Sequence, residues 1–455
     1  MLALTPAARS VTLQFLLFSL ASAFLLLTGL ALARAVTGTT DLSAFLAAGP
    51  VAAPAFVLIA LGCLVKIGVI GVHVWLPAAY AKADDDFSAM LSAVVGKVAV
   101  FGLFMAAYQA ARSDAGLELA RALGWIGMLT TVIAAFLALQ QAEMKRMLAY
   151  SSLSQTGYII TAVALMSHLG WVTALYLVAN HLMVKGILFL VAAAVIERTG
   201  LTRLEACGGL ARRMPLTFAV AIVALVSMSG LPPLAGFGGK WLLLSAMVDR
   251  GWYGPLALGV LATLVGLLYM VRFGHAVFLG PLKLEHATLR EAPAALLVPQ
   301  CVLVAGILLL SFFPKLLMDP VSAAIDPQFA STLVWQGMSL ELIYAYWNPA
   351  RAMAGAVGLA LLGAALMWIF YRIGRRSSRS GGPARFFRYY RPLLAPVLAS
   401  HAERFWGAVS ATVGGAAGTA RRVYTGNGQT YALQVLAYVL VLYLFVVAFP
   451  LIGGG

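Results

Sequence analysis

Long apolar runs follow one another along almost the whole chain, separated by short polar or glycine-rich connections. Most of them reach the roughly 20 residues that a helix needs to cross a lipid bilayer. The pattern therefore predicts an all-α fold, a polytopic transmembrane bundle of about eleven helices. The predicted helices cover 11–33, 52–75, 87–110, 119–140, 147–167, 169–196, 216–246, 254–280, 292–313, 351–372 and 430–450.

The run 216–246 is longer than a straight span needs and contains helix-breaking residues. Pro232 and Pro233 lack the backbone N–H that a helix interior requires, and Gly236 follows them closely. Broken helices occur at membrane depth where they line a polar cavity, and in transporters they often mark the ion site. The sequence therefore predicts a helix break at Pro232, Pro233 and Gly236.

Composition supports a membrane protein and excludes a water-soluble domain. Hydrophobic residues make up 62% of the 455 residues and charged residues only 10%, against about 25% charged residues in soluble domains. Much of the net charge of +15 comes from the segment 373–429, which holds nine arginines against one acid, Glu403. A basic block beside a span indicates a cytoplasmic loop that meets membrane lipid, rather than binding of nucleic acid.

The distribution of basic residues among the loops predicts the orientation of the chain. The N-terminus and 373–429 are expected in the cytoplasm, for a multi-pass protein of the cell inner (cytoplasmic) membrane. The loop 315–350 is expected outside, with Trp335 and Trp347 as interface anchors. The stretch 385–391 combines arginine with aromatic residues. It fits either a helix lying on the inner leaflet or a docking surface for a neighbouring subunit, and both remain open.

We expect no cofactor, metal or catalytic centre in this chain. Cys63, Cys207 and Cys301 form no Cys-x-x-Cys pair, so the sequence predicts no disulfide framework, zinc site or iron–sulfur cluster. It also contains no nucleotide-binding fingerprint. The three aspartates at 84–86 are interpreted as a solvated loop, with cation binding as the alternative.

Four lysines lie inside the predicted helices, where a charge costs about 2.5–3.5 kcal/mol at the bilayer centre. They are Lys66, Lys97, Lys185 and Lys240. Snorkelling of the side chain to the headgroups explains Lys66 and Lys240 more easily than the other two, which have long apolar stretches on both sides. His181 lies four residues before Lys185 and therefore shares its helical face.

A row of lysines linked by histidine, hydroxyl groups and water can pass protons through a membrane. We therefore predict a proton path through Lys66, Lys97, His181, Lys185 and Lys240. The predicted supporting polar residues are His73, Tyr150, Ser154 and Tyr158.

Several strings, in this order and spacing, resemble one family, the antiporter-like subunits of respiratory complex I. The same family includes membrane subunits of energy-converting hydrogenases and of multisubunit sodium/proton antiporters. The resemblance covers about 10–280. The strings are Lys66-x-Gly68, His73-Val-Trp-Leu-Pro77, Ser88-Ala-Met-Leu-Ser92 with Lys97, Lys145-Arg-Met-Leu-Ala-Tyr-Ser-Ser152, Gly157-Tyr158, His181-x-x-x-Lys185, and Ser229-Gly-Leu-Pro-Pro233 with Gly236-Phe237 and Lys240.

The resemblance implies a fold of two inverted five-helix repeats, each with a broken helix that carries a key lysine. Lys66 would belong to the first broken helix, Lys97 to the helix after it, His181 and Lys185 to a connecting helix, and Lys240 to the second broken helix. The implied organisation is 1–110 as the remainder of the first repeat, 111–290 as the second repeat, 291–372 as peripheral transmembrane helices with the outside loop, 373–429 as the basic cytoplasmic segment, and 430–455 as the C-terminal transmembrane helix.

The sequence departs from the family pattern near its first lysine. The family has further N-terminal helices, and one carries a glutamate that pairs with the equivalent of Lys66. Three explanations remain open: a separate chain supplies these helices, the true start lies upstream, or this variant has lost half a channel. Gly71 stands where the family has proline, and the aspartates at 84–86 replace a proline-rich stretch. A helix break at Lys66 is therefore less clearly predicted than the one before Lys240.

The function implied is that of a proton-translocating membrane subunit in a complex I-like assembly, of NADH:quinone oxidoreductase or hydrogenase type. Its partners would be the other membrane subunits, and redox chemistry would take place in those other chains. Two alternatives remain open. The chain could belong to a multisubunit sodium/proton antiporter without a redox partner, or it could be a non-conducting structural subunit.

Overall fold

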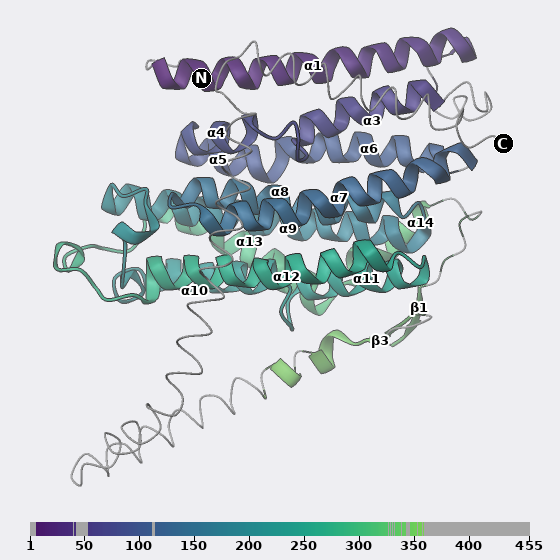
Figure 1. Cartoon of the computed structure of the whole chain (residues 1–455). Coiled ribbons are helices and arrows are strands. Elements are labelled where there is room, and N and C mark those ends of the chain that lie inside the picture. The colour runs from purple at the N-terminus through teal and green to yellow at the C-terminus, as the bar shows by residue number, and fades with distance from the viewer. Residues whose placement is uncertain are drawn as a thin grey trace, which may run out of the picture. The chain divides into compact units, whose positions relative to one another are not determined.

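The computed structural model describes residues 6–39, 41, 53–111 and 114–325, and parts of 327–358. Described residues up to Ala350 belong to one compact unit, built mainly of helices that pack along one another (Figure 1). Its long helices are α1 (Pro6–Thr37), α3 (Ala53–Ile67), α6 (Gly96–Ala110), α7 (Asp114–Gln140), α8 (Met144–Ala164), α9 (His168–Thr199), α10 (Pro215–Ser229), α11 (Ala235–Asp249), α12 (Tyr253–Gly274) and α13 (Ala294–Phe312).

Shorter elements connect or extend these helices. They are α4 (Trp75–Lys82), α5 (Asp85–Met90), the π-helical turn η2 (Leu91–Val95), the 3₁₀ turns η3 (Leu204–Ala206), η4 (Leu210–Arg212) and η6 (Leu284–His286), the π-helical turn η5 (His275–Leu279), and α14 (Lys315–Ala324).

The prediction of a helical membrane protein is confirmed. Within the described residues, six helices are long and apolar enough to cross a membrane. They cover Ser10–Thr37, Phe87–Ala110, Gly116–Gln140, His168–Thr199, Tyr253–Leu279 and Ala294–Phe312. Most of the predicted run 351–372 and all of the predicted run 430–450 lie outside the described residues. The total of about eleven helices therefore stays a prediction.

Helix α8 lies at the centre of the packing and contacts α7, α9, α4 and α6. Almost all of its side chains are buried, including many serines and threonines. It packs very closely on α7, because a Cβ added at Gly127 would lie only 2.8 Å from the carbonyl oxygen of Gly157. A helix enclosed by other helices can carry a polar face that lipid would not tolerate. This explains how α8 can be polar within an apolar bundle.

Two of the predicted runs are interrupted rather than continuous. The run 52–75 splits into α3 and α4, between Ile67 and Trp75. The run 216–246 splits into α10 and α11, with Pro232 and Pro233 in the gap and Gly236 in the first turn of α11. The Ser311 hydroxyl of α13 accepts a hydrogen bond from the Ala235 N–H at 2.8 Å, so a neighbouring helix caps the start of α11.

A small antiparallel sheet in the segment after α14 was not predicted by the sequence. It consists of β1 (Val334–Gln336), β2 (Ser339–Glu341) and β3 (Tyr346–Trp347), with Leu340 facing both Trp335 and Trp347 in register. Trp347 is buried and its ring contacts that of Tyr176, with 6.3 Å between centroids. The predicted role of Trp347 as an exposed interface anchor is therefore wrong.

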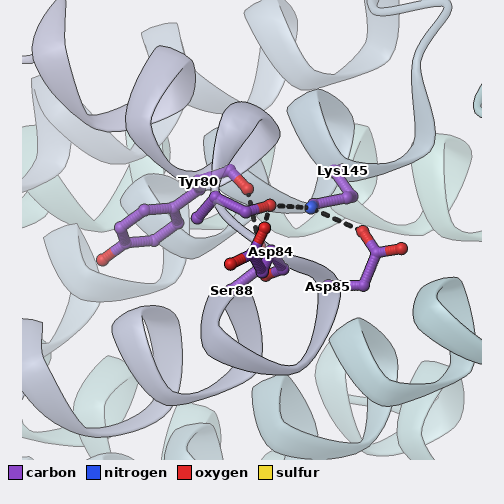
Figure 2. A network of polar contacts seen from close by, with 6 residues as sticks. Tyr80, Asp84, Asp85, Ser88 and Lys145 are labelled. Atoms are coloured by element: carbon purple, nitrogen blue, oxygen red, sulfur yellow. Dashed lines mark hydrogen bonds and ion pairs between the residues drawn. The ribbon is translucent and has the colours of Figure 1, made fainter. Parts of the chain in front are cut away.

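The interpretation of 84–86 as a solvated loop is wrong for Asp85, which begins α5 and forms an ion pair with Lys145 of α8 (Figure 2). The buried Lys145 ammonium donates to the Asp85 carboxylate at 2.7 Å and to the carbonyl of Ala83 at 2.6 Å. The Ser88 hydroxyl contacts the carbonyls of Tyr80 and Asp84 nearby, both at 2.9 Å. These contacts fix the junction of α4 and α5 against α8.

We predict that Lys145→Ala destabilises the protein, because it leaves the Asp85 carboxylate and the Ala83 carbonyl without their shared donor. The expected loss is about 1–3 kcal/mol. Thermal unfolding of the full chain in detergent measures it. Lys82→Ala is the matched control, since Lys82 is an exposed lysine at the end of α4. Equal unfolding temperatures for the two variants would contradict the prediction.

Candidate functional site

Three of the four predicted lysines are enclosed by the protein. Lys97, Lys185 and Lys240 are 9%, 0% and 5% exposed, whereas Lys66 is half-buried. Such burial leaves no room for the three enclosed side chains to snorkel to a lipid surface. Each ammonium must therefore find its hydrogen-bond acceptors inside the protein.

Lys240 receives its acceptors from the interruption between α10 and α11. Its ammonium donates to the carbonyls of Met228 and Ser229 at 3.0 and 3.2 Å. These are at the C-terminal end of α10, where carbonyls lack helical partners and the helix dipole favours a cation. Gly230 has a φ of +75°, and a Cβ there would lie 2.6 Å from the Lys240 side chain. The residues that end the helix thus also make room for the lysine.

The other side of Lys240 faces an aromatic ring. Its ammonium lies 5.1 Å from the centre of the Tyr158 ring on α8, a cation–π contact. The Tyr158 hydroxyl points elsewhere, to the Gly259 carbonyl at 2.8 Å and the Thr263 hydroxyl at 2.7 Å, both on α12. Tyr158, which the sequence predicted as a supporting residue, therefore contacts Lys240 through its ring.

Lys97 depends on the π-helical turn η2. Its ammonium donates to the carbonyl of Ser92 in that turn at 2.9 Å. A π turn within an α-helix shifts the regular backbone pairing and often lies at functional sites. The Ser92 hydroxyl lies 2.8 Å from the hydroxyl of Ser152 on α8. Ser92 therefore connects Lys97 to α8, because its carbonyl accepts from the lysine and its hydroxyl contacts Ser152.

Lys185 contacts the same region of α8 from α9. Its ammonium donates to the Leu148 carbonyl at 3.0 Å and lies 2.5 Å from the Ser151 hydroxyl. The Ser152 hydroxyl donates to the same Leu148 carbonyl at 2.8 Å. Since Ser152 uses its hydrogen there, the Ser92 hydroxyl is the donor in the contact between the two serines. A chain of contacts thus runs from Lys97 through Ser92, Ser152 and Leu148 to Lys185.

His181 lies within this group, one helical turn before Lys185, and is buried. It is close enough to Lys97 and Lys185 for electrostatic interaction with both, and the backbone of Ser152 lies near its ring. Within the described part of the chain, neither ring nitrogen makes a hydrogen bond of normal geometry. A buried imidazole near other titratable groups can exchange a proton with a neighbour or with water.

Lys66 is not part of this group. Its ammonium donates to the Ser19 hydroxyl at 2.9 Å and lies 5.1 Å from the centre of the Phe15 ring, both on α1. The ion pairs between described residues do not include Lys66. His73, in the gap between α3 and α4, lies with its ring 6.1 Å from that of Tyr150 on α8.

The remaining polar residues attach α8 and α9 to their neighbours. Ser154, predicted as a supporting residue, donates to the Thr131 carbonyl on α7 at 2.9 Å. Asn180 on α9 accepts from the Ser227 hydroxyl of α10 at 2.7 Å. Sequence reasoning missed the pairing of Ser92 with Ser152, because 60 residues separate them. It also missed Tyr269, a buried tyrosine of α12. An aromatic residue in an apolar run fits a membrane helix, so the sequence pattern does not mark it as a functional residue.

The described residues contain no group of three or more His, Cys, Asp and Glu side chains that could hold a metal ion. Cys63 and Cys207 are buried free thiols, and Cys301 is exposed. In the loop between α9 and α10, burial raises the pKa of the Cys207 thiol to about 11. That thiol therefore stays protonated near neutral pH and is a poor metal ligand.

Comparison with known proteins places this arrangement in a family. Residues 5–266 match the family described as NADH:quinone oxidoreductase/Mrp antiporter, TM. The chain is 31% identical over 328 residues to NADH-quinone oxidoreductase subunit N of Desulforudis audaxviator, covering 68% of this chain and 66% of the relative. It is 29% identical over 385 residues to hydrogenase-4 component B of Escherichia coli, covering 76% and 56% respectively.

The fold is also that of a solved structure. It resembles a chain of the membrane-bound sulfane sulfur reductase, an archaeal respiratory membrane complex, with a TM-score of 0.71 and 27% sequence identity. This alignment covers 95% of the present chain and 76% of the other. The chain spans slightly less than two thirds of the length of the Desulforudis audaxviator relative and just over half of the Escherichia coli relative. The family match covers more than half of the sequence, so the chain belongs to the NADH:quinone oxidoreductase/Mrp antiporter transmembrane family.

Proposed function

We propose that the chain is a proton-translocating membrane subunit of a complex I-like assembly, of NADH:quinone oxidoreductase or hydrogenase type. The observation that carries the proposal is the chain of contacts that joins Lys97 to Lys185 through Ser92, Ser152 and Leu148. The names of the two relatives supply the class of assembly.

The acceptors of the lysines divide into two kinds with different roles. Carbonyl oxygens, such as those of Ser92 and Leu148, only accept hydrogen bonds and therefore hold an ammonium in place. Hydroxyl groups both accept and donate, so those of Ser151 and Ser152 can pass a proton on. Like charges repel strongly where water is scarce. A proton that arrives at Lys97 therefore favours departure of the proton held by Lys185.

The two interrupted helices support the proposal of two inverted repeats, 1–110 and 111–290. Lys66 precedes the first interruption as the second-last residue of α3, and Lys240 follows the second as the sixth residue of α11. Each interrupted run thus carries a lysine beside its break, on the N-terminal side in the first run and on the C-terminal side in the second. The roles of 291–372, 373–429 and 430–455 as peripheral helices, basic segment and final helix remain part of the proposal.

The proposal includes partners and an orientation. The other membrane subunits of the assembly would flank the chain, and one of them would supply a carboxylate to Lys66, which the structure pairs with a hydroxyl and an aromatic ring. The N-terminus and 373–429 would face the cytoplasm from the inner membrane, as the basic residues indicate. The segment 373–429 lies outside the described residues.

The second candidate is a sodium/proton antiporter subunit, because the family description includes the Mrp antiporters. Proton transport by the assembled complex in vesicles discriminates between them when sodium is replaced by choline. A redox-driven proton subunit keeps its transport in choline, whereas a sodium/proton exchanger loses it. Unchanged transport in both Lys97→Ala and Lys185→Ala would instead favour a non-conducting subunit.

We predict that Lys240→Ala lowers proton translocation by the reconstituted complex more than tenfold. The reason is that the site formed by Met228, Ser229 and Tyr158 then holds no titratable group. Translocation is measured as the pH change inside vesicles for each substrate turnover. Lys82→Ala, at an exposed lysine, is the control and should leave translocation unchanged. Translocation at the level of the unmodified protein in Lys240→Ala would refute the assigned role.

We also predict that Ser152→Ala lowers translocation roughly tenfold, because the Ser92 hydroxyl loses its acceptor and the contact between the lysine sites is broken. The double variant Ser92→Ala/Ser152→Ala should be no slower than either single one, since both remove the same link. Ser245→Ala is the matched control. Ser245 is also buried, but in the part of the chain that the structure describes its hydroxyl donates to the Trp241 carbonyl of its own helix. Additive losses in the double variant would contradict a single link.

A further inference from the structure

Hydrogen bonds link Lys97 to Lys185 within the described residues. Among the same residues, no such series of hydrogen bonds links Lys185 to Lys240. Lys185 contacts Ser151 and Lys240 contacts Tyr158, and both of these lie on α8. The two residues are seven positions apart in the helix, which is about 10 Å along its axis. Ser154 and Gln155 lie between them on the same face of α8, by helical spacing. The side chains at 154 and 155 therefore lie along α8 between the residues that contact the two lysines.

Tyr269 of α12 faces this part of α8. Its side chain is fully buried, and within the described residues its hydroxyl makes no hydrogen bond of normal geometry. Ser154 and Gln155 nevertheless lie beside this hydroxyl, and Tyr158 is close enough for electrostatic interaction. A Cβ placed at Gly266, one turn earlier on α12, would lie 3.6 Å from the hydroxyl oxygen, so the glycine brings no side chain against this group.

The neighbours of Tyr269 are oriented for proton transfer. The Ser154 hydroxyl donates its hydrogen to the Thr131 carbonyl on α7, so its oxygen remains available to accept from Tyr269. The Gln155 amide can both donate and accept. Native proteins seldom leave a buried hydroxyl without a partner, and such groups often mark a bound water or a functional role.

Tyr158 is less suited to the same task, although the sequence drew attention to it. Its hydroxyl is held by Gly259 and Thr263 on α12, and it presents its ring rather than its oxygen to Lys240. The Tyr158 hydroxyl is thus engaged with α12 rather than with Lys240.

We propose that the Tyr269 hydroxyl relays protons between the Lys185 site and the Lys240 site, across the face of α8 formed by Ser154 and Gln155. In each passage the hydroxyl oxygen accepts a proton on one side and releases its own hydrogen on the other. The phenol is neutral before and after, and rotation about its C–O bond resets it. Water completes the contacts on both sides. The relay rests on the proposed proton-translocating function.

The test is Tyr269→Phe in the full chain, assembled in its complex and reconstituted in vesicles. This substitution removes only the hydroxyl, so the unfolding temperature should stay unchanged, while translocation falls about tenfold for each substrate turnover. Gln155→Leu should give a similar loss, and the double variant should be no slower than Tyr269→Phe. Tyr176→Phe is the matched control, because its buried hydroxyl donates to the Leu310 carbonyl of α13 rather than to a residue of either lysine site. It should keep full translocation.

Failure of the relay and failure of the proposed function give different results. If Lys240→Ala abolishes translocation while Tyr269→Phe leaves it unchanged, the relay is wrong and the function stands. If both variants translocate like the unmodified protein, the proposed function is wrong as well. A loss in Tyr269→Phe accompanied by an equal loss in Tyr176→Phe would indicate a structural effect and overturn the relay.

Discussion

An ammonium group that leaves water must find hydrogen-bond acceptors in the protein, and much of this structure provides them. A regular helix uses its own carbonyls and has few to offer. The chain therefore departs from regular helix beside two of its buried lysines. The end of α10 supplies the Met228 and Ser229 carbonyls to Lys240, and the π turn η2 supplies the Ser92 carbonyl to Lys97. The irregular backbone at these two places thus supplies the acceptors that the buried ammonium groups need.

Lys185 meets the same requirement differently, and this explains the central place of α8. No break lies beside it, so the Leu148 carbonyl of α8 is shared with serine hydroxyls. A helix with this many serines can be stable within a membrane only when other helices cover it. The close approach of α7 at Gly127 and Gly157 contributes to that cover. Enclosure by α4, α6, α7 and α9 therefore makes a polar α8 possible.

The sequence predicted those features that have a local signal. Proline and glycine between α10 and α11 indicated that break, and lysines inside apolar runs indicated buried charge. The break after Ile67 was less evident, because Gly71 replaces the expected proline, yet α3 ends there. Contacts between distant segments had no such signal. The ion pair of Asp85 with Lys145, and the burial of Trp347 in the small sheet, depend on how distant segments pack, which no window of sequence contains.

The burial of Trp347 connects the small sheet to the helix that carries Lys240. A Cβ at Gly238 of α11 would overlap the indole of Trp347, so the two residues occupy one shared space. Gly238 lies only two residues before Lys240. A mutation to alanine at 238 must therefore be compensated by a smaller side chain at 347, or the lysine is displaced. The residue at 238 on α11 thus limits which side chains fit at 347 in the sheet. The two positions are expected to covary as the family evolves.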